Sequence, residues 1–228
     1  MALPNITNRQ KDILLHLYRF RFLNRKHIQA LLNQKDYKNT NLWLKDLTEK
    51  NYTGKIFERK PGITEPAIYY LSKNGIKFLH SVEGIEGKNL KKLRQEKRKS
   101  QAFIQYSLSI AQAYLQLQET YTDGFKFYTQ SDFPTNGVIK DLSPSFAYVY
   151  SEGDILHQVT CEIFKENTPR FAIRARIQQY IEFFEDKPDM KIHFFTSSEK
   201  LLSYITRYSQ RSLSENDSEL AIESFLIS

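Results

Sequence analysis

The stretch from Thr40 to Leu79 constrains the fold most, because it predicts a helix, a β-hairpin and a second helix in immediate succession. The spacing of its apolar residues favours a helix from Thr40 to Lys50. β-branched and aromatic residues favour strands from Lys55 to Arg59 and from Ala67 to Leu71, with a loop rich in proline and glycine between them. Ser72 is then expected to cap a new helix.

Two more helices are predicted before this stretch. Thr7 and Gln10 have the spacing of a capping box and precede apolar residues at helical spacing, so a first helix is expected from about Asn8 to Phe20. Asn24 is a good N-cap for a second helix. Three helices followed by a hairpin form a winged helix-turn-helix module, whose third helix enters the major groove of duplex DNA while the hairpin lies along the backbone.

The outer face of the third helix is basic and rich in amides, whereas Leu44 and Leu47 are expected to face the core. Asn forms paired hydrogen bonds with adenine, and Lys reaches guanine acceptors or phosphates. The predicted DNA-binding residues are Lys35, Lys38, Asn39, Asn41 and Lys45 on or before this helix, Arg59 and Lys60 in the hairpin, and Lys91 and Lys92 further along the chain. The alternative interpretation is an ordinary polar helix surface.

The charge is divided unevenly between the two halves of the chain. Residues 1–100 carry 22 Lys and Arg against 9 Asp and Glu, a balance of +13, and residues 101–228 carry 11 against 17, a balance of −6. A polyanionic partner of the first half explains this division, because each cation that neutralises a phosphate releases a condensed counterion. The alternative is a basic surface without a partner.

Several classes of protein are not favoured by the composition. The sequence has no apolar run near 18 residues and no long apolar core of a secretory signal, so we expect a cytoplasmic protein without a membrane partner. Cys161 is the single cysteine, and the five histidines lack metal-site spacing. We therefore expect no cofactor and no metal.

The second half begins after a linker marked by Gly84 and Gly87. One long helix is predicted from Leu90 to Gln118, with a basic first half and an amphipathic second half. Strands are then predicted at residues 125–129, 146–150, 156–164 and 190–196, with a helix from Thr168 before the last strand and another from Ser198 to about Tyr208. Arg170, Arg174 and Arg176 on the first of these helices extend the DNA path or form a solvated face.

The expected fold class is α+β, with an N-terminal winged helix-turn-helix, a long connecting helix and a C-terminal α/β domain on a mixed sheet. The expected domains are residues 1–82 for DNA binding, residues 83–120 for the linker and long helix, residues 121–210 for the α/β domain and residues 211–228 for an acidic tail.

The chain resembles the replication-relaxation family of plasmid and mobile-element proteins, and its second half is similar to the core of restriction-endonuclease-like nucleases. The resemblance rests on the run from Asn8 to Leu79, on Leu142-Ser143-Pro144-Ser145-Phe146-Ala147-Tyr148, and on Glu162-Ile163-Phe164 followed by a basic helix from Arg170. It implies a DNA-binding accessory factor in plasmid replication, DNA relaxation or mobilisation.

The nuclease chemistry of such a core needs two carboxylates to hold Mg²⁺ and a lysine to support the attacking water. Here Ser145 stands where the first acid is expected, and Phe164 stands where the lysine is expected. Lys165 falls on the opposite face of a strand. The sequence therefore predicts a nuclease-like domain without activity, in which Glu162 is an edge or hydrogen-bonded carboxylate.

From these patterns we expect a non-catalytic accessory factor that binds double-stranded DNA as a homodimer, with a replication or mobilisation protein as a further partner. Two alternatives stay open. One is a transcriptional repressor that acts on its own promoter through the same DNA surface. The other is a Mg²⁺-dependent DNA endonuclease with a displaced active site formed by Glu162, Glu166 and Asp154.

Overall fold

The computed structural model describes residues 3–57, 59–60, 63–64, 66–133, 141–187, 189–216 and 218–227, and for residues 59, 60, 63 and 64 it describes the backbone alone. The chain forms two compact units, Met1–Ala111 and Gln112–Ser228, whose boundary falls inside helix α6 (Gln101–Thr120). No helix in the described ranges is long and apolar enough to cross a membrane.

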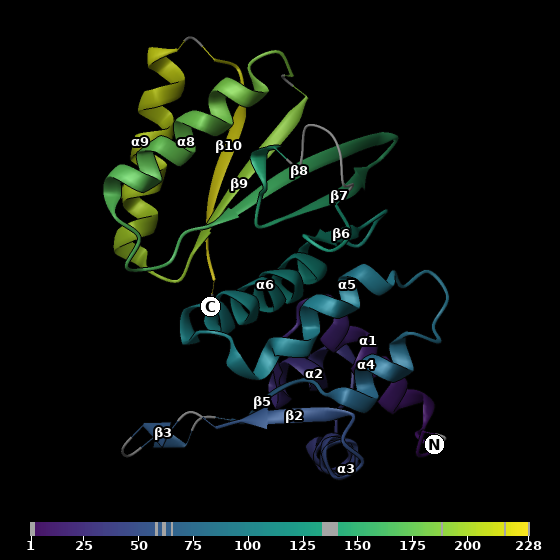
Figure 1. Cartoon of the computed structure of the whole chain (residues 1–228). Helices are drawn as coiled ribbons and strands as arrows, with labels where there is room; N and C mark the ends of the chain where they lie inside the picture. The colour runs from purple at the N-terminus through teal and green to yellow at the C-terminus, as the bar shows by residue number, and fades with distance from the viewer. Residues whose placement is uncertain are drawn as a thin grey trace. The chain divides into compact units, whose positions relative to one another are not determined.

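Unit 1 contains the predicted helices and hairpin, in the predicted order. Its elements are α1 (Asn8–Phe20), β1 (Leu23–Asn24), α2 (Arg25–Leu31), α3 (Tyr37–Glu49), β2 (Thr53–Ile56), β3 (Arg59–Lys60), β4 (Ile63–Thr64), β5 (Ile68–Leu71), α4 (Lys73–Leu79), α5 (Gly87–Lys92) and the 3₁₀ helix η1 (Leu93–Arg98). β2 and β5 pair antiparallel, and β3 pairs with β4 further out (Figure 1). The sequence analysis missed β1, a two-residue strand that pairs with β5 on the other side.

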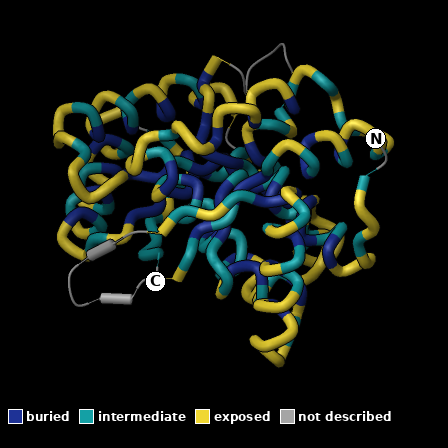
Figure 2. Tube along the Cα trace, turned by 60° about the horizontal axis from the view of Figure 1, so that its bottom comes forward, coloured by how far each residue is buried: buried dark blue, intermediate teal, exposed yellow. Residues whose placement is uncertain are grey.

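Local chemistry explains where the first helices begin. The Thr7 side chain accepts a hydrogen bond from the backbone N–H of Gln10, and the Gln10 side chain accepts one from the backbone N–H of Thr7, so the predicted capping box is confirmed. Asn24 caps α2 in the same manner by accepting from the backbone N–H of His27. The inner sides of the helices carry the buried residues (Figure 2), which in α1 are Gln10, Ile13, Leu14, Leu17 and Phe20.

The single long helix predicted from Leu90 to Gln118 is wrong. α5 ends at Lys92, η1 continues to Arg98, and Lys99 has an extended backbone with φ −68° and ψ 144°. The Ser100 hydroxyl then accepts a hydrogen bond from the backbone N–H of Phe103, which favours a new helix start at α6. Leu90, Leu93 and Glu96, on the two segments before the break, are buried.

Unit 2 is built on a mixed sheet, as predicted, but the sheet has five strands where four were predicted. Its elements after α6 are β6 (Lys126–Thr129), β7 (Phe146–Glu152), β8 (Ile155–Ile163), α8 (Arg170–Phe184), β9 (Met190–Thr196), α9 (Glu199–Glu215) and β10 (Ala221–Leu226). The strand order is β10-β9-β8-β7-β6, with antiparallel pairing from β6 to β8 and parallel pairing from β8 to β10.

Helices cover both faces of this sheet. α8 and α9 lie on one face (Figure 1), and their apolar side chains form a core with β9 that includes Ile177, Tyr180, Ile192, Phe194 and Ile205. The part of α6 that belongs to unit 2 lies on the other face, where the rings of Tyr114 and Phe127 meet edge to face at 5.1 Å. Coverage on both faces explains why β9 reads as a nearly continuous apolar run.

The acidic tail predicted at residues 211–228 is also wrong. α9 continues to Glu215, beyond the expected end near Tyr208, and β10 then pairs with β9 from Ala221 to Leu226. The ring of Phe225 stacks on that of Phe195 at 5.3 Å, which fixes the strand on the sheet. Glu223 and Ser224 interrupt the apolar pattern of β10, so this strand was not predicted from the sequence.

Gly75 provides a test of the packing of unit 1. An added Cβ would lie 2.3 Å from the backbone oxygen of Tyr52, and a backbone atom cannot move aside cheaply. We expect Gly75→Ala to lower the free energy of unfolding by about 2 kcal/mol, measured by urea denaturation. Gly87→Ala is the matched control, because the nearest atom there is His80 Cε1 at 3.4 Å. Equal stability of the two variants would contradict this packing.

Candidate functional site

α3 presents most of the predicted DNA-binding residues on one exposed surface. The Asp36 side chain accepts a hydrogen bond from the backbone N–H of Lys38 at 2.8 Å, so α3 starts three residues earlier than predicted. Leu44 and Leu47 are fully buried, which confirms that they face the core. The exposed residues of this segment include all five predicted ones, Lys35, Lys38, Asn39, Asn41 and Lys45.

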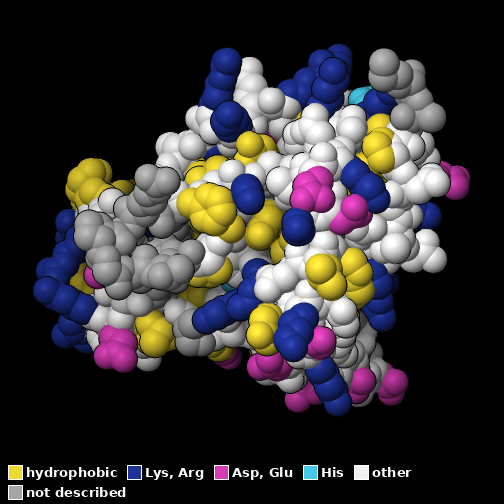
Figure 3. Space-filling model, turned by 90° about the horizontal axis from the view of Figure 1, so that it is seen from below, with side chains coloured by type: hydrophobic (Ala, Val, Ile, Leu, Met, Phe, Trp, Pro, Cys, Tyr) yellow, Lys and Arg dark blue, Asp and Glu magenta, His cyan; other side chains and the backbone are white. Residues whose placement is uncertain are grey.

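The electrostatics of this surface leave its cations available to an anion. Lys45 is paired with Glu49 at 3.9 Å, but both side chains are largely exposed, so water screens the pair. Asp36 is engaged in capping, and Asp46 accepts hydrogen bonds from Lys50 and Gln10, which lower its pKa. Figure 3 shows several groups of Lys and Arg side chains on the side of unit 1 that carries α3 and β2.

Sequence reasoning missed the exposed apolar side chains of the same surface. Leu42 is 63% exposed and Tyr37 is 52% exposed, although both belong to α3. Phe57, just after β2, is 60% exposed, and the Lys55 ammonium lies 5.2 Å from its ring centroid. The spacing of Lys38, Leu42 and Lys45 is the signal that places an apolar side chain between two cations.

Of the remaining predicted DNA-binding residues, Lys91 and Lys92 do not join this surface. Lys91 and Lys92 are exposed at the end of α5, but α3 and α5 lie at opposite ends of unit 1 (Figure 1). Arg59 and Lys60 lie in β3, and their side chains are outside the described part of the chain.

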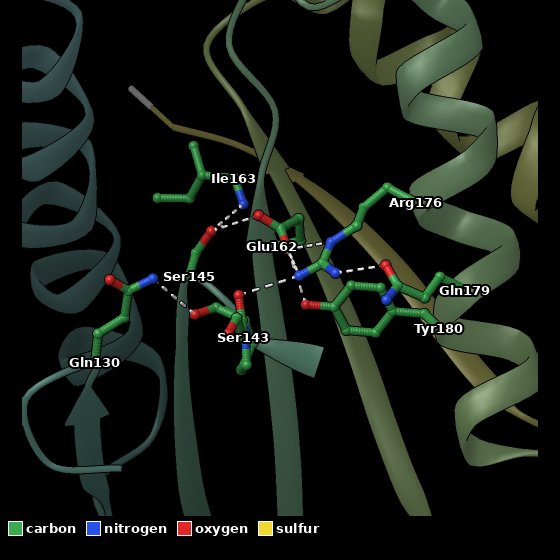
Figure 4. A network of polar contacts seen from close by, with 9 residues as sticks. Gln130, Ser143, Ser145, Glu162, Ile163, Arg176, Gln179 and Tyr180 are labelled. Atoms are coloured by element: carbon green, nitrogen blue, oxygen red, sulfur yellow. Dashed lines mark hydrogen bonds and ion pairs between the residues drawn. The ribbon is translucent and has the colours of Figure 1, made fainter. Parts of the chain in front are cut away.

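Unit 2 contains a polar network centred on Glu162, near the end of β8 (Figure 4). Glu162 Oε1 accepts a hydrogen bond from the Ser145 hydroxyl at 2.7 Å, and the Ser145 oxygen accepts one from the backbone N–H of Ile163 at 2.9 Å. Glu162 Oε2 accepts from the Tyr180 hydroxyl at 3.0 Å. Burial, and then the charge of Glu162, raise the pKa of Tyr180, so the phenol stays protonated as a donor.

Arg176 completes this network. Its Nε and Nη2 donate to Glu162 Oε2 at 2.8 and 2.5 Å, and Nη2 also donates to the backbone oxygen of Ser143 at 3.1 Å. Nη1 donates to Gln179 on the same helix. The sequence analysis expected Arg176 either to extend a DNA path or to lie on a solvated helix face. Neither describes this residue, because its guanidinium binds Glu162, Ser143 and Gln179 within unit 2.

The network has consequences for the chemistry of this site. A hard divalent cation takes about six oxygen ligands, with carboxylates among them. Glu162 already accepts four hydrogen bonds, two of them from a guanidinium, and Ser145 supplies no second carboxylate. Phe164, at the position of the expected lysine, is buried with its ring 5.4 Å from Phe194. Glu162 is therefore the hydrogen-bonded carboxylate that the sequence predicted.

The residues of the displaced active site are not brought together. Asp154 lies before β8 and Glu162 near its end, eight residues later, which in a strand corresponds to about 26 Å. Glu166 follows β8 as an exposed residue. Within the described ranges, no group of three or more His, Cys, Asp and Glu residues is placed to hold a metal ion.

The first part of the chain is similar to a known protein family. A model of the replication-relaxation family matches residues 14–136, which is more than half of the sequence. No curated protein sequence matches the chain.

Among solved structures, the restriction endonuclease FokI bound to DNA is similar with a TM-score of 0.35 and 13% identity, over 98% of this chain and 44% of that one. A further structure of the restriction endonuclease FokI gives a TM-score of 0.32 and 15% identity, over 92% of this chain and 43% of that one. The chain thus spans less than half the length of these structures.

Removal of Arg176 tests the role of the Glu162 network. We expect Arg176→Ala to lower the free energy of unfolding by about 2 kcal/mol, because it leaves a carboxylate in a mostly buried position without its cation. Thermal denaturation followed by circular dichroism measures this. Arg174→Ala, on an exposed part of α8, should change stability by less than about 0.5 kcal/mol. Equal effects of the two substitutions would show that the ion pair between Arg176 and Glu162 does not stabilise the fold.

Proposed function

The chain belongs to the replication-relaxation family, and we propose that it is a duplex DNA-binding accessory factor in the replication, relaxation or mobilisation of a plasmid or other mobile element. In this proposal unit 1 is a winged helix-turn-helix module. α3 enters the major groove, and the hairpin of β3 and β4 lies along the phosphate backbone.

The surface of α3 is the observation that supports the proposal most strongly. Lys38 and Lys45 supply phosphate or guanine contacts, and Asn39 and Asn41 supply the paired hydrogen bonds that identify adenine. These side chains are exposed on a helix that Leu44 and Leu47 hold against the core, so the surface is presented on a rigid element.

The charge distribution agrees with this assignment. Residues 1–100 carry the whole positive balance of the chain, with +13 against −6 for the rest. Counterion release makes such a surface bind polyanions at low salt, and base contacts then add specificity. If the same surface binds DNA upstream of the chain's own gene, the protein would also repress its own transcription.

Unit 2 is proposed to act without catalysis. The Glu162 carboxylate is neutralised by Arg176 and accepts hydrogen bonds from Ser145 and Tyr180. The described residues therefore contain no pair of free carboxylates placed to bind a hard cation. Unit 2 is then available for assembly, either with a second copy or with a replication or mobilisation protein. A homodimer would place two α3 helices about 34 Å apart along the DNA.

Charge reversal on α3 tests the DNA interface. We expect Lys38→Glu to weaken binding to a duplex roughly tenfold at about 100 mM salt and to reduce the slope of log K against log salt concentration by about one. Fluorescence anisotropy of a labelled duplex measures both quantities.

The matched control is Lys200→Glu, which changes the net charge equally at an exposed position of α9 in unit 2. It should leave the affinity within about twofold of the wild type, because the change lies outside the proposed contact surface. Equal losses of affinity in the two variants would mean that only the net charge of the protein matters. Unchanged binding by Lys38→Glu would show that α3 does not contact the DNA.

Incubation of supercoiled plasmid with the protein and Mg²⁺ or Mn²⁺ tests the absence of catalysis. We expect the plasmid to stay supercoiled on an agarose gel, because Glu162 is saturated by donors. Nicking or linearisation that Glu162→Gln abolishes would instead establish the endonuclease. Glu162→Gln keeps the shape of the side chain, so loss of activity would report on the carboxylate.

A further inference from the structure

A concave site lies within unit 1, between β5, α4 and η1. Its volume is about 590 Å³, in the range of roughly 300–1,000 Å³ that small-molecule sites occupy. Its floor consists of residues that are at most 9% exposed, namely Tyr70, Leu71, Ile76 and Leu93. The cavity therefore has an apolar floor of buried side chains.

Cations surround the opening of this cavity. Lys73 and Lys77 line it from α4, and Arg94 and Lys97 line it from η1, all four with exposed side chains. Glu96 is the single acidic residue in the lining, and its Oε1 is already paired with Arg21. The rim consequently favours a negatively charged group at the opening.

Glu96 also supplies an unsatisfied acceptor. The side chain is 1% exposed, and Oε2 is buried without any hydrogen-bond partner in the described structure. Burial raises the pKa of Glu96, and Arg21 opposes this shift. Because this side chain is almost fully enclosed and is paired with Arg21, Glu96 adds little negative charge at the opening of the cavity.

We propose that this cavity binds a small amphipathic organic anion, with an aromatic or alicyclic body on the apolar floor and its anionic group at the Lys and Arg rim. The two parts of the ligand correspond to the two parts of the lining. This site is separate from the α3 surface, so it exists whether or not α3 binds DNA.

The probe for the first test is 8-anilinonaphthalene-1-sulfonate, which combines an aromatic body, a sulfonate and an anilino N–H. The full-length protein should bind it saturably at one site, with a dissociation constant in the micromolar range by fluorescence titration. N-Phenyl-1-naphthylamine has the same body and N–H without the sulfonate, and it should bind at least about fivefold more weakly. Equal affinity of the two compounds, or no saturation up to about 1 mM sulfonate, overturns the proposal.

Variants locate the site. The double substitution Lys73→Glu and Lys97→Glu should weaken binding of the sulfonate at least about tenfold, because both cations lie at the rim. Lys26→Glu paired with Lys200→Glu is the control, since it changes the net charge equally at exposed positions outside the lining. Equal weakening in both double variants overturns the assignment to this cavity.

Chemical-shift mapping on the wild-type protein gives an independent readout that needs no variant to fold. Addition of the sulfonate should move the backbone amide signals of Leu71, Ser72, Leu93 and Glu96 before those of other residues. Perturbation confined to unit 2, or to the exposed apolar residues of α3, overturns the proposal even when the probe binds.

Discussion

The ion pair between Arg176 and Glu162 determines what unit 2 can do. It joins α8 to β8 and, through the oxygen of Ser143, to the turn that precedes β7. The same contacts direct two N–H groups of a guanidinium at Glu162 Oε2, so the carboxylate is neutralised by a residue of the same unit. One side chain thus stabilises the fold and occupies the carboxylate that a bound cation would require.

The α3 surface of unit 1 has the opposite character, because its predicted DNA-binding side chains are exposed to solvent. Leu44 and Leu47 anchor α3, and the capping by Asp36 orients its first turn, so the exposed amides and cations are held by a rigid element. The basic excess of residues 1–100 adds long-range attraction for a polyanion. The two units therefore divide the proposed work between recognition of DNA and assembly.

Local signals made parts of this fold predictable. α1 and β9 were predicted well, because a capping box marks the start of the first and an apolar run marks the second. The break at Lys99 and the strand β10 were not, because both depend on burial against elements far away in the sequence. The absence of the nuclease lysine was readable at Phe164, but the partner of Glu162 was not, since Arg176 meets it only after α8 folds back on the sheet.

The most direct measurement of the central claim is a map of backbone amide chemical shifts on addition of a short duplex DNA in the presence of Mg²⁺. The account predicts changes in α3 and in β2 of unit 1, with the amides around Glu162 and Arg176 unaffected and the duplex intact at the end of the titration. Changes centred on Glu162, or cleavage of the duplex, would contradict it and would assign the DNA to unit 2.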